Sequence, residues 1–147
     1  MADACGCSVI QMNCGSSPLA KRKEWNSGNW TEGRYRSFVT STLRSGARRW
    51  PPKFETLNAA KTEKRVNSKT GRLAQHFLCN GCGEEFPAKD VQVDHINPVV
   101  SPSKGFKSWD DFIDKLYCEK DNLQVLCLTC HKKKTNEEKQ EKKNANQ

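Results

Sequence analysis

Four of the eight cysteines form two Cys-x-x-Cys pairs, and this spacing is the clearest chemical signal in the sequence. The first pair is Cys79 with Cys82, and the second is Cys127 with Cys130. Two thiolates on one tight turn supply half of a tetrahedral metal site, so two such turns together suit a structural zinc ion. The 44 residues between the pairs exceed the usual gap of a zinc ribbon, so we expect another element to be looped out between them.

Two of the three histidines flank this cysteine frame, which suggests hydrolytic chemistry beside the zinc site. His95 directly follows Asp94, His131 directly follows the last cysteine, and Asn122 precedes the second pair. A carboxylate and an imidazole can bind a divalent ion while another imidazole deprotonates water, as phosphodiester hydrolysis requires. Taken singly, Asp94 or Asn122 could cap a turn, and His131 could support the zinc site from outside. The third histidine, His76, belongs to no motif and is interpreted as structural.

The elements expected around these residues are two short strands and two helices. Residues 91–96 and 123–127 are β-branched, strand-like runs. Between them, Ser108 and Asp111 resemble a capping box that starts a helix with a core-facing apolar stripe. The chain from Leu128 is polar and helix-prone, and it is expected to fray into a charged tail. The apolar stripe comprises Trp109, Phe112, Ile113, Leu116 and Tyr117.

The N-terminal half predicts two more helices followed by a turn and an extended segment. The first helix would begin at Thr31 and stop at Gly46, and the second would run from about Lys53 to Arg65 after two prolines. Residues 67–71 read as a turn and residues 73–78 as extended chain. Three tryptophans could stack on bases, but anchoring of small elements is favoured. The residues expected to face inward are Tyr35, Phe38, Val39, Leu43, Phe54 and Leu57, and the tryptophans are Trp25, Trp30 and Trp50.

The net charge of +8 is unevenly distributed along the chain. Residues 21–72 hold fourteen Lys or Arg against four Glu. Concentrated positive charge attracts polyanions by neutralising phosphates and releasing counterions, although a solvated, solubilising surface would give the same composition. The arginines proposed to bind DNA are Arg34, Arg36, Arg44, Arg48 and Arg49.

Taken together, the motifs C-N-G-C, V-D-H-I-N-P and D-N-L-Q-V-L-C-L-T-C-H-K-K-K-T resemble the HNH endonuclease family. The resemblance covers about residues 77–135, and the N-terminal part resembles small free-standing HNH proteins of bacteriophages. It implies an α+β fold with a ββα-metal (HNH) catalytic core, stapled by a four-cysteine zinc site and preceded by a basic helical N-terminal region. Segment 98–121 departs from the minimal family core, so its path is left open.

The resemblance also implies a role for each motif residue. Asp94 and His131 match the ligands of the catalytic divalent ion, expected to be Mg²⁺ or Mn²⁺ because such ions prefer mixed oxygen and nitrogen sites with open positions. His95 matches the general base, and Asn122 matches the residue that orients the base or supports its loop. The residues that match structural Zn²⁺ ligands are Cys79, Cys82, Cys127 and Cys130.

The predicted organisation has four parts. Residues 1–20 form a flexible tail containing Cys5, Cys7 and Cys14, which we interpret as incidental thiols. Residues 21–72 form the basic helical DNA-binding extension, residues 73–136 the zinc-stapled HNH module with an inserted helix near 108–118, and residues 137–147 a charged tail. No secretory signal and no bilayer-length apolar run is visible, so a cytoplasmic location is expected, that of the bacterial host if the protein is phage-encoded.

The expected function is metal-dependent hydrolysis of DNA phosphodiester bonds by one catalytic metal ion, with nicking or double-strand cleavage as the outcome. Two alternatives stay open at this point. One is a zinc-stabilised DNA-binding module without catalysis, and the other is an RNA nuclease, because a basic surface does not distinguish the two sugars. A homodimer or a phage protein would be a compatible partner, and no membrane is expected.

Overall fold

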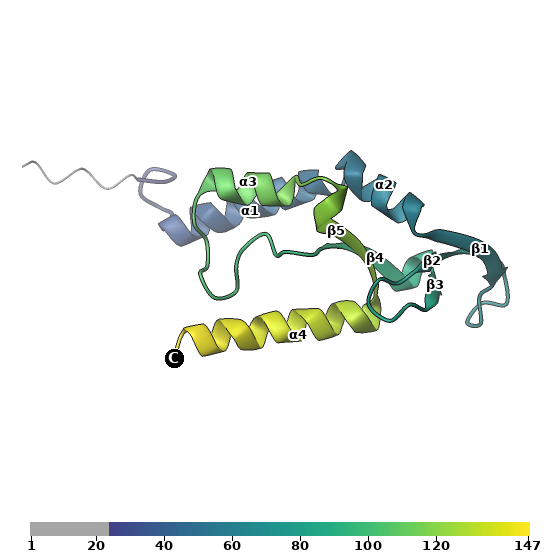
Figure 1. Ribbon diagram of the computed structural model, residues 1–147. Helices are drawn as coiled ribbons and strands as arrows, with labels where there is room; N and C mark the ends of the chain where they lie inside the picture. The colour runs from purple at the N-terminus through teal and green to yellow at the C-terminus, as the bar shows by residue number, and fades with distance from the viewer. Residues whose placement is uncertain (1–23) are drawn as a thin grey trace, which may run out of the picture. The chain divides into compact units, whose positions relative to one another are not determined.

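The computed structural model describes residues 24–147, and the chain divides into two compact units, the first ending at Tyr35 and the second running from Arg36 to Gln147. Figure 1 shows the order of the elements. The helices are α1 (Glu32–Ala47), α2 (Pro51–Ala59), α3 (Trp109–Leu116) and α4 (Leu128–Ala145), with short 3-10 turns η1 (Ala88–Asp90) and η2 (Lys120–Asn122). The strands are β1 (Lys61–Val66), β2 (Leu73–Leu78), β3 (Glu85–Pro87), β4 (Val91–His95) and β5 (Leu123–Cys127).

Helix α1 begins as the sequence predicts, because the Thr31 hydroxyl oxygen accepts the backbone N–H of Arg34 at 3.2 Å. The helix continues one residue past Gly46 to Ala47, which is buried. The expected inward face is wrong at Phe38, whose side chain is 57% exposed. The α1 residues that join the hydrophobic core are Leu43 and Ala47, at the C-terminal end of the helix.

The predicted second helix ends at Ala59, and the residues expected to continue it to Arg65 form strand β1 instead. Strand β1 pairs antiparallel with β2, with Val66 opposite Leu73. The predicted turn is confirmed, since the Asn67 N–H donates to the Arg72 carbonyl oxygen and the Gly71 N–H donates to the Asn67 carbonyl oxygen, both at 2.8 Å. Hairpin pairing gives these backbone groups partners, which outweighs a weak local helix preference.

The same correction affects the side chains of α2. Leu57 is half-buried, but Phe54 is 52% exposed and does not face the interior as predicted. Helix α2 has only nine residues, so a single short face of it packs against β4 and β5. Pro52 is the buried residue of the helix.

The strands form two sheets. Strands β1, β2 and β3 lie in that order in one antiparallel sheet, and β4 pairs with β5 in the other. Both strands of the second sheet fall where the sequence predicts them. Its register places Val91 opposite Cys127 at one end and His95 opposite Leu123 at the other. Cys127 and His95 therefore lie at opposite ends of this two-stranded sheet.

Segment 98–121, whose path the sequence leaves open, packs on α1. Its helix α3 starts at the predicted cap, where the Ser108 hydroxyl oxygen accepts the Asp111 N–H at 3.2 Å. The Tyr117 hydroxyl donates to the Leu43 carbonyl oxygen at 2.9 Å, and a Cβ at Gly46 would lie 2.9 Å from that hydroxyl. The resulting core contains the buried residues Ala47, Val99, Phe112 and Leu116.

Trp50 ties this inserted segment to the start of α2. Its indole Nε1 donates to the Cys118 carbonyl oxygen at 2.7 Å, and its ring meets the Tyr117 ring edge-on at 5.4 Å. The anchoring role predicted for this tryptophan is confirmed. In the first unit, Trp25 stacks on Tyr35 with ring centroids 3.4 Å apart.

Helix α4 follows β5 without a loop and extends to Ala145, so residues 137–145, expected as a charged tail, are helical. None of the helices described within residues 24–147 is long and apolar enough to cross a lipid bilayer. Cys5, Cys7 and Cys14 lie outside the described residues. The order β4, β5, α4 is the strand–strand–helix unit that carries the candidate site.

Candidate active site

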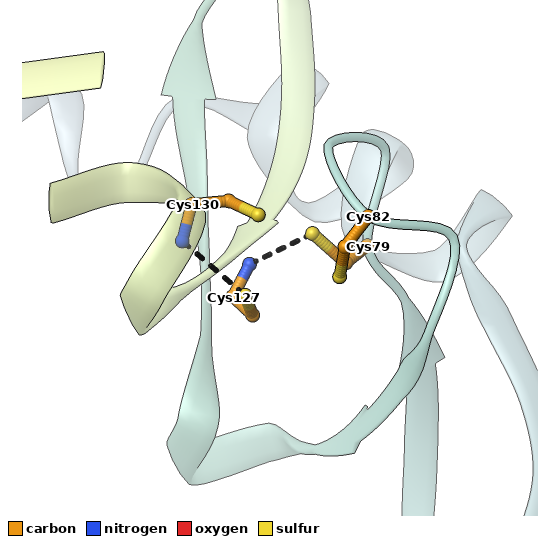
Figure 2. Close-up of side chains that lie close together, drawn as sticks. All are labelled: Cys79, Cys82, Cys127 and Cys130. Carbon is orange, nitrogen blue, oxygen red and sulfur yellow. Dashed lines mark hydrogen bonds between the residues drawn. The ribbon is translucent and has the colours of Figure 1, made fainter. Parts of the chain in front are cut away.

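The four cysteines predicted to bind zinc come together at one end of the β4–β5 sheet, as Figure 2 shows. All four sulfur atoms lie within 4.8 Å of one another. Cys79 and Cys127 are buried, Cys130 is half-buried and Cys82 is exposed. The first pair lies in the turn after β2, and the second spans the end of β5 and the first turn of α4.

Backbone N–H groups point at the sulfur atoms of this cluster. The Cys79 Sγ accepts from the Gly81 N–H at 3.3 Å and from the Cys127 N–H at 3.2 Å. The Cys127 Sγ accepts from the Cys130 N–H at 3.4 Å, and this N–H is one of those in the first turn of α4 that have no partner within the helix. These donors favour thiolates over thiols, so the cluster is preorganised for a cation that needs deprotonated sulfur.

Glycine is required at the second position of the first turn. A Cβ at Gly81 would lie 2.9 Å from both the Cβ and the Sγ of Cys130 and 3.3 Å from the Leu126 side chain. The next glycine, Gly83, has a φ of +75°, which closes the turn with its N–H donating to the Cys79 carbonyl oxygen at 2.9 Å. Asn80 then joins this turn to β5 through its N–H and its side-chain oxygen, both bonded to Val125.

The titration of the thiols fits a site for a divalent ion. Burial acts to raise the pKa of Cys79, but hydrogen bonds from the backbone of Cys127, Cys82 and Gly81 bring that pKa down to about 6. Hydrogen bonding with Cys127, followed by burial, raises the pKa of Cys130 to about 12. The Cys79 thiol therefore loses its proton readily, whereas the Cys130 thiol loses its proton only when a nearby positive charge stabilises the thiolate. Four close sulfur ligands are therefore suited to a metal such as zinc.

The proposed catalytic ligands meet beside the same sheet. Asp94 is near the end of β4, and His131 is in the first turns of α4, which follows β5 directly. The Asp94 Oδ1 and the His131 Nε2 lie 3.9 Å apart, and both side chains are partly exposed. Two donor atoms at this separation can share one ion, because each metal–ligand bond is about 2 Å long.

Lys134 is a site residue that the sequence reasoning missed. Its Nζ donates to the Asp94 Oδ2 at 2.7 Å and to the His95 carbonyl oxygen, and it forms an ion pair with Glu138 at 3.1 Å. Burial alone would lower the pKa of Lys134, but the hydrogen bonds and charges of Asp94 and Glu138 raise it. The available signal was helical spacing, since a residue three positions after His131 shares its helix face.

His95 is buried, and its ring is held by the inserted segment. The Nε2 atom lies 3.2 Å from the Leu116 carbonyl oxygen at the end of α3. Because a carbonyl only accepts, Nε2 must carry the hydrogen, which leaves Nδ1 with a free lone pair. Burial, the largest influence, lowers the pKa of His95, and the charge of Lys53 lowers it further. The ring is thus held in the neutral form that accepts a proton.

Asn122 fastens the chain just after His95. Its Oδ1 accepts the Asn97 N–H at 2.8 Å, and its own carbonyl oxygen accepts the Ile96 N–H at 2.9 Å. The side-chain Nδ2 also donates to the Asn97 carbonyl oxygen at 3.4 Å. Of the two roles implied by the resemblance, these contacts favour loop support, which stays a proposal.

The arginines proposed to bind DNA have different surroundings. Arg34 lies over the Trp30 ring, with its Cζ 5.0 Å from the ring centroid. Arg36 and Arg44 lie 4.5 Å and 5.8 Å from the ring centroids of Phe106 and Phe112. Arg48 and Arg49, just beyond α1, are exposed.

Comparison with known proteins agrees with this ββα arrangement. A family model described as HNH endonuclease matches residues 79–137. A protein of Lactococcus phage SK1 described as "Probable HNH endonuclease" is 40% identical over 72 residues, which are 48% of this chain and 67% of that protein. No solved structure matches the chain significantly.

The structure contains a strand–strand–helix unit beside four cysteines that could hold a metal ion, and the matched residues contain both proposed sites. The chain belongs to the HNH endonuclease family, as the motif resemblance predicts. Membership of this family makes it a nuclease that acts on nucleic acid.

Proposed function

We propose that this protein is a metal-dependent endonuclease that hydrolyses DNA phosphodiester bonds with a single catalytic metal ion and His95 as general base. One observation carries the proposal: the Asp94 Oδ1 and the His131 Nε2 lie 3.9 Å apart where β4 runs beside α4, and His95 is the next residue of β4. A non-catalytic DNA-binding module would have no need for a carboxylate, a buried neutral imidazole and a second imidazole at one point.

Each of these residues has a separate task in the proposed reaction. The Nδ1 lone pair of His95 takes a proton from water as the water oxygen attacks phosphorus, and the bond from phosphorus to the leaving sugar oxygen breaks. When bound by Asp94 and His131, a divalent ion would polarise the phosphate and stabilise the leaving oxygen, which then takes a proton from solvent. The Leu116 carbonyl oxygen keeps the His95 hydrogen on Nε2 throughout.

Two different metals suit the two sites. Four thiolates suit Zn²⁺ in a closed structural site, whereas a carboxylate with an imidazole suits Mg²⁺ or Mn²⁺ with open positions for substrate. Cys127 and Asp94 are carried by opposite ends of the β4–β5 sheet, whereas Cys130 and His131 are consecutive residues of α4, so this helix supplies one ligand to each site.

The test compares three single variants in cleavage of supercoiled plasmid as Mg²⁺ or Mn²⁺ is titrated. Removing a general base should slow the reaction about 10²- to 10⁴-fold without changing the metal requirement, so His95→Ala should stay slow at every metal concentration. Asp94→Ala and His131→Ala should instead need more metal and be partly rescued by it. Nicked circles and linear product distinguish single-strand from double-strand cleavage in the same assay.

Asp114→Ala is the matched control, because Asp114 is an exposed carboxylate on α3 outside the site. It should cleave like the unmodified protein. Equal cleavage by His95→Ala and the unmodified protein would remove the general-base assignment. A protein that cleaves a matched RNA and leaves DNA intact would instead be an RNA nuclease.

A further inference from the structure

Lys53 lies on the helix that packs against the proposed catalytic strands. It is the third residue of α2, and α2 packs against both β4 and β5. The start of this helix is fixed, because Pro52 is buried and Trp50 is hydrogen-bonded to the Cys118 carbonyl oxygen. The position of the Lys53 backbone is therefore determined by the packing of α2 on the sheet and by the contacts of Trp50 and Pro52.

The charges around Lys53 are those of the proposed active site. Burial is the main cause that lowers the pKa of Lys53, the charges of Cys118 and Asp94 act to raise it, and Arg44 acts to lower it. Helix α2 also contacts η2, which ends at Asn122, so Lys53 belongs to the helix that covers the histidine end of the sheet.

Within the described part of the chain, Lys53 nevertheless has no acceptor of its own. Within residues 24–147 its ammonium forms no hydrogen bond and no ion pair, although its side chain is half-buried. Lys134, by contrast, is neutralised by Asp94 and Glu138. Partly burying an ammonium without an acceptor costs free energy, so such a group is suited to an anion that arrives with a ligand.

We propose that Lys53 binds a non-bridging oxygen of the phosphate that is cleaved. This inference rests on the proposed nuclease function and adds a second cation to its site. Charge on the phosphate oxygens must be neutralised as water attacks, and a half-buried ammonium on the helix that packs on β4 and β5 would do this from the α2 side. Lys53 would then be a catalytic residue, while Lys134, satisfied by protein carboxylates, would hold Asp94 in position.

The competing explanation is that the Lys53 methylene chain packs on the sheet while its head reaches water. Lys53→Met keeps a long apolar chain and removes the charge, whereas Lys53→Arg keeps the charge. A structural role would be filled better by methionine, and a phosphate-binding role by arginine. Lys120→Met is the matched control, because Lys120 is an exposed lysine that pairs with Glu55.

The cleavage experiment measures kcat and KM of these variants with plasmid DNA and saturating Mg²⁺, after zinc content and thermal unfolding have been checked. Loss of one preorganised electrostatic contact typically lowers kcat about 10²- to 10³-fold. Lys53→Met should show a loss of this order, Lys53→Arg should recover much of it, and Lys120→Met should match the unmodified protein. Full activity in Lys53→Met would overturn the inference, as would a rise in KM alone.

A second measurement does not depend on cleavage. Trace acetylation of the unmodified protein, without added Mg²⁺, is compared by mass spectrometry with and without a duplex oligonucleotide. DNA should protect Lys53 and leave Lys120 reactive. Equal labelling of Lys53 in both samples contradicts the inference whether or not the protein cleaves DNA. If Lys53 is protected but no variant cleaves, the phosphate contact stands and the proposed nuclease reaction is the part that fails.

Discussion

The residues at the two ends of the β4–β5 sheet are held in place in different ways. At the cysteine end, all four ligands come from two copies of one short pattern, and backbone N–H groups donate to the Cys79 and Cys127 sulfur atoms. At the histidine end, the groups come from β4, η2, α3 and α4, and they are held by hydrogen bonds between these separate elements. We infer that the cysteine end stabilises the fold, whereas the histidine end brings together groups from separate elements.

This difference predicts that substitutions at the two ends of the sheet change different properties of the protein. Substitutions at the cysteine end should change folding and zinc content together. Substitutions at the histidine end should change the rate while leaving the fold and the zinc in place. Four experiments, ordered from the largest expected effect to the smallest, test whether the effects of the two ends separate in this way.

Cys127→Ser should abolish the folded module. A structural zinc site contributes on the order of 10 kcal/mol to folding, and the Cys127 sulfur also accepts the Cys130 N–H at the start of α4. We expect loss of bound zinc by elemental analysis and loss of the cooperative thermal transition. Cys118→Ser is the control, because Cys118 is a free thiol outside the four-sulfur cluster, and it should keep about one zinc per chain. A folded, active, zinc-free Cys127→Ser protein would refute the structural role.

Gly81→Ala should destabilise the module without removing a ligand. The new Cβ would lie 2.9 Å from the Cys130 Sγ, and overpacking of this kind costs about 1–3 kcal/mol. Denaturant unfolding should show the loss, and competition with a chelator should show faster release of zinc. Gly33→Ala is the matched change in α1, where the nearest atom would be 4.0 Å away. If both variants unfold alike, the close approach at Gly81 is not what holds the turn.

Asn122→Ala should slow cleavage about 10- to 100-fold, the usual effect of losing a residue that supports a metal site from outside. Its Oδ1 holds the Asn97 N–H, two residues after His95. Asn122→Asp keeps an acceptor at that position and should recover part of the rate. Zinc content should stay unchanged in both variants. A loss of zinc in Asn122→Ala would show that the two ends are coupled.

Replacing Arg48 and Arg49 together by alanine should have the smallest effect, and only on affinity for DNA. Both side chains are exposed, and phosphate contacts position a protein without contributing chemistry. Binding should weaken, and the slope of log affinity against log salt should flatten by about one unit per lost contact. A double alanine variant at Lys142 and Lys143, in the last turn of α4, removes equal charge as a control. Indistinguishable binding by the two double variants would place the DNA surface elsewhere.

The sequence by itself determined the features that depend on local pattern. The paired cysteine spacing predicted the four-sulfur cluster, the strand-like runs predicted β4 and β5, and the Ser108 cap predicted the start of α3. The motif residues also predicted the family. Such patterns succeed because a knuckle, a capped helix and a strand each express their geometry within a few neighbouring residues.

Tertiary structure decided what depends on distant partners. The segment predicted as helix up to Arg65 became a strand because β2 supplied hydrogen-bond partners for it. The inserted segment 98–121 proved to hold the His95 ring through the Leu116 carbonyl oxygen. Lys53 has no local signal among the 25 Lys and Arg residues, and its half-buried, unpaired state exists only once α2 has packed on the sheet. Burial and charge are properties of the assembled fold, so no spacing along the chain could reveal them.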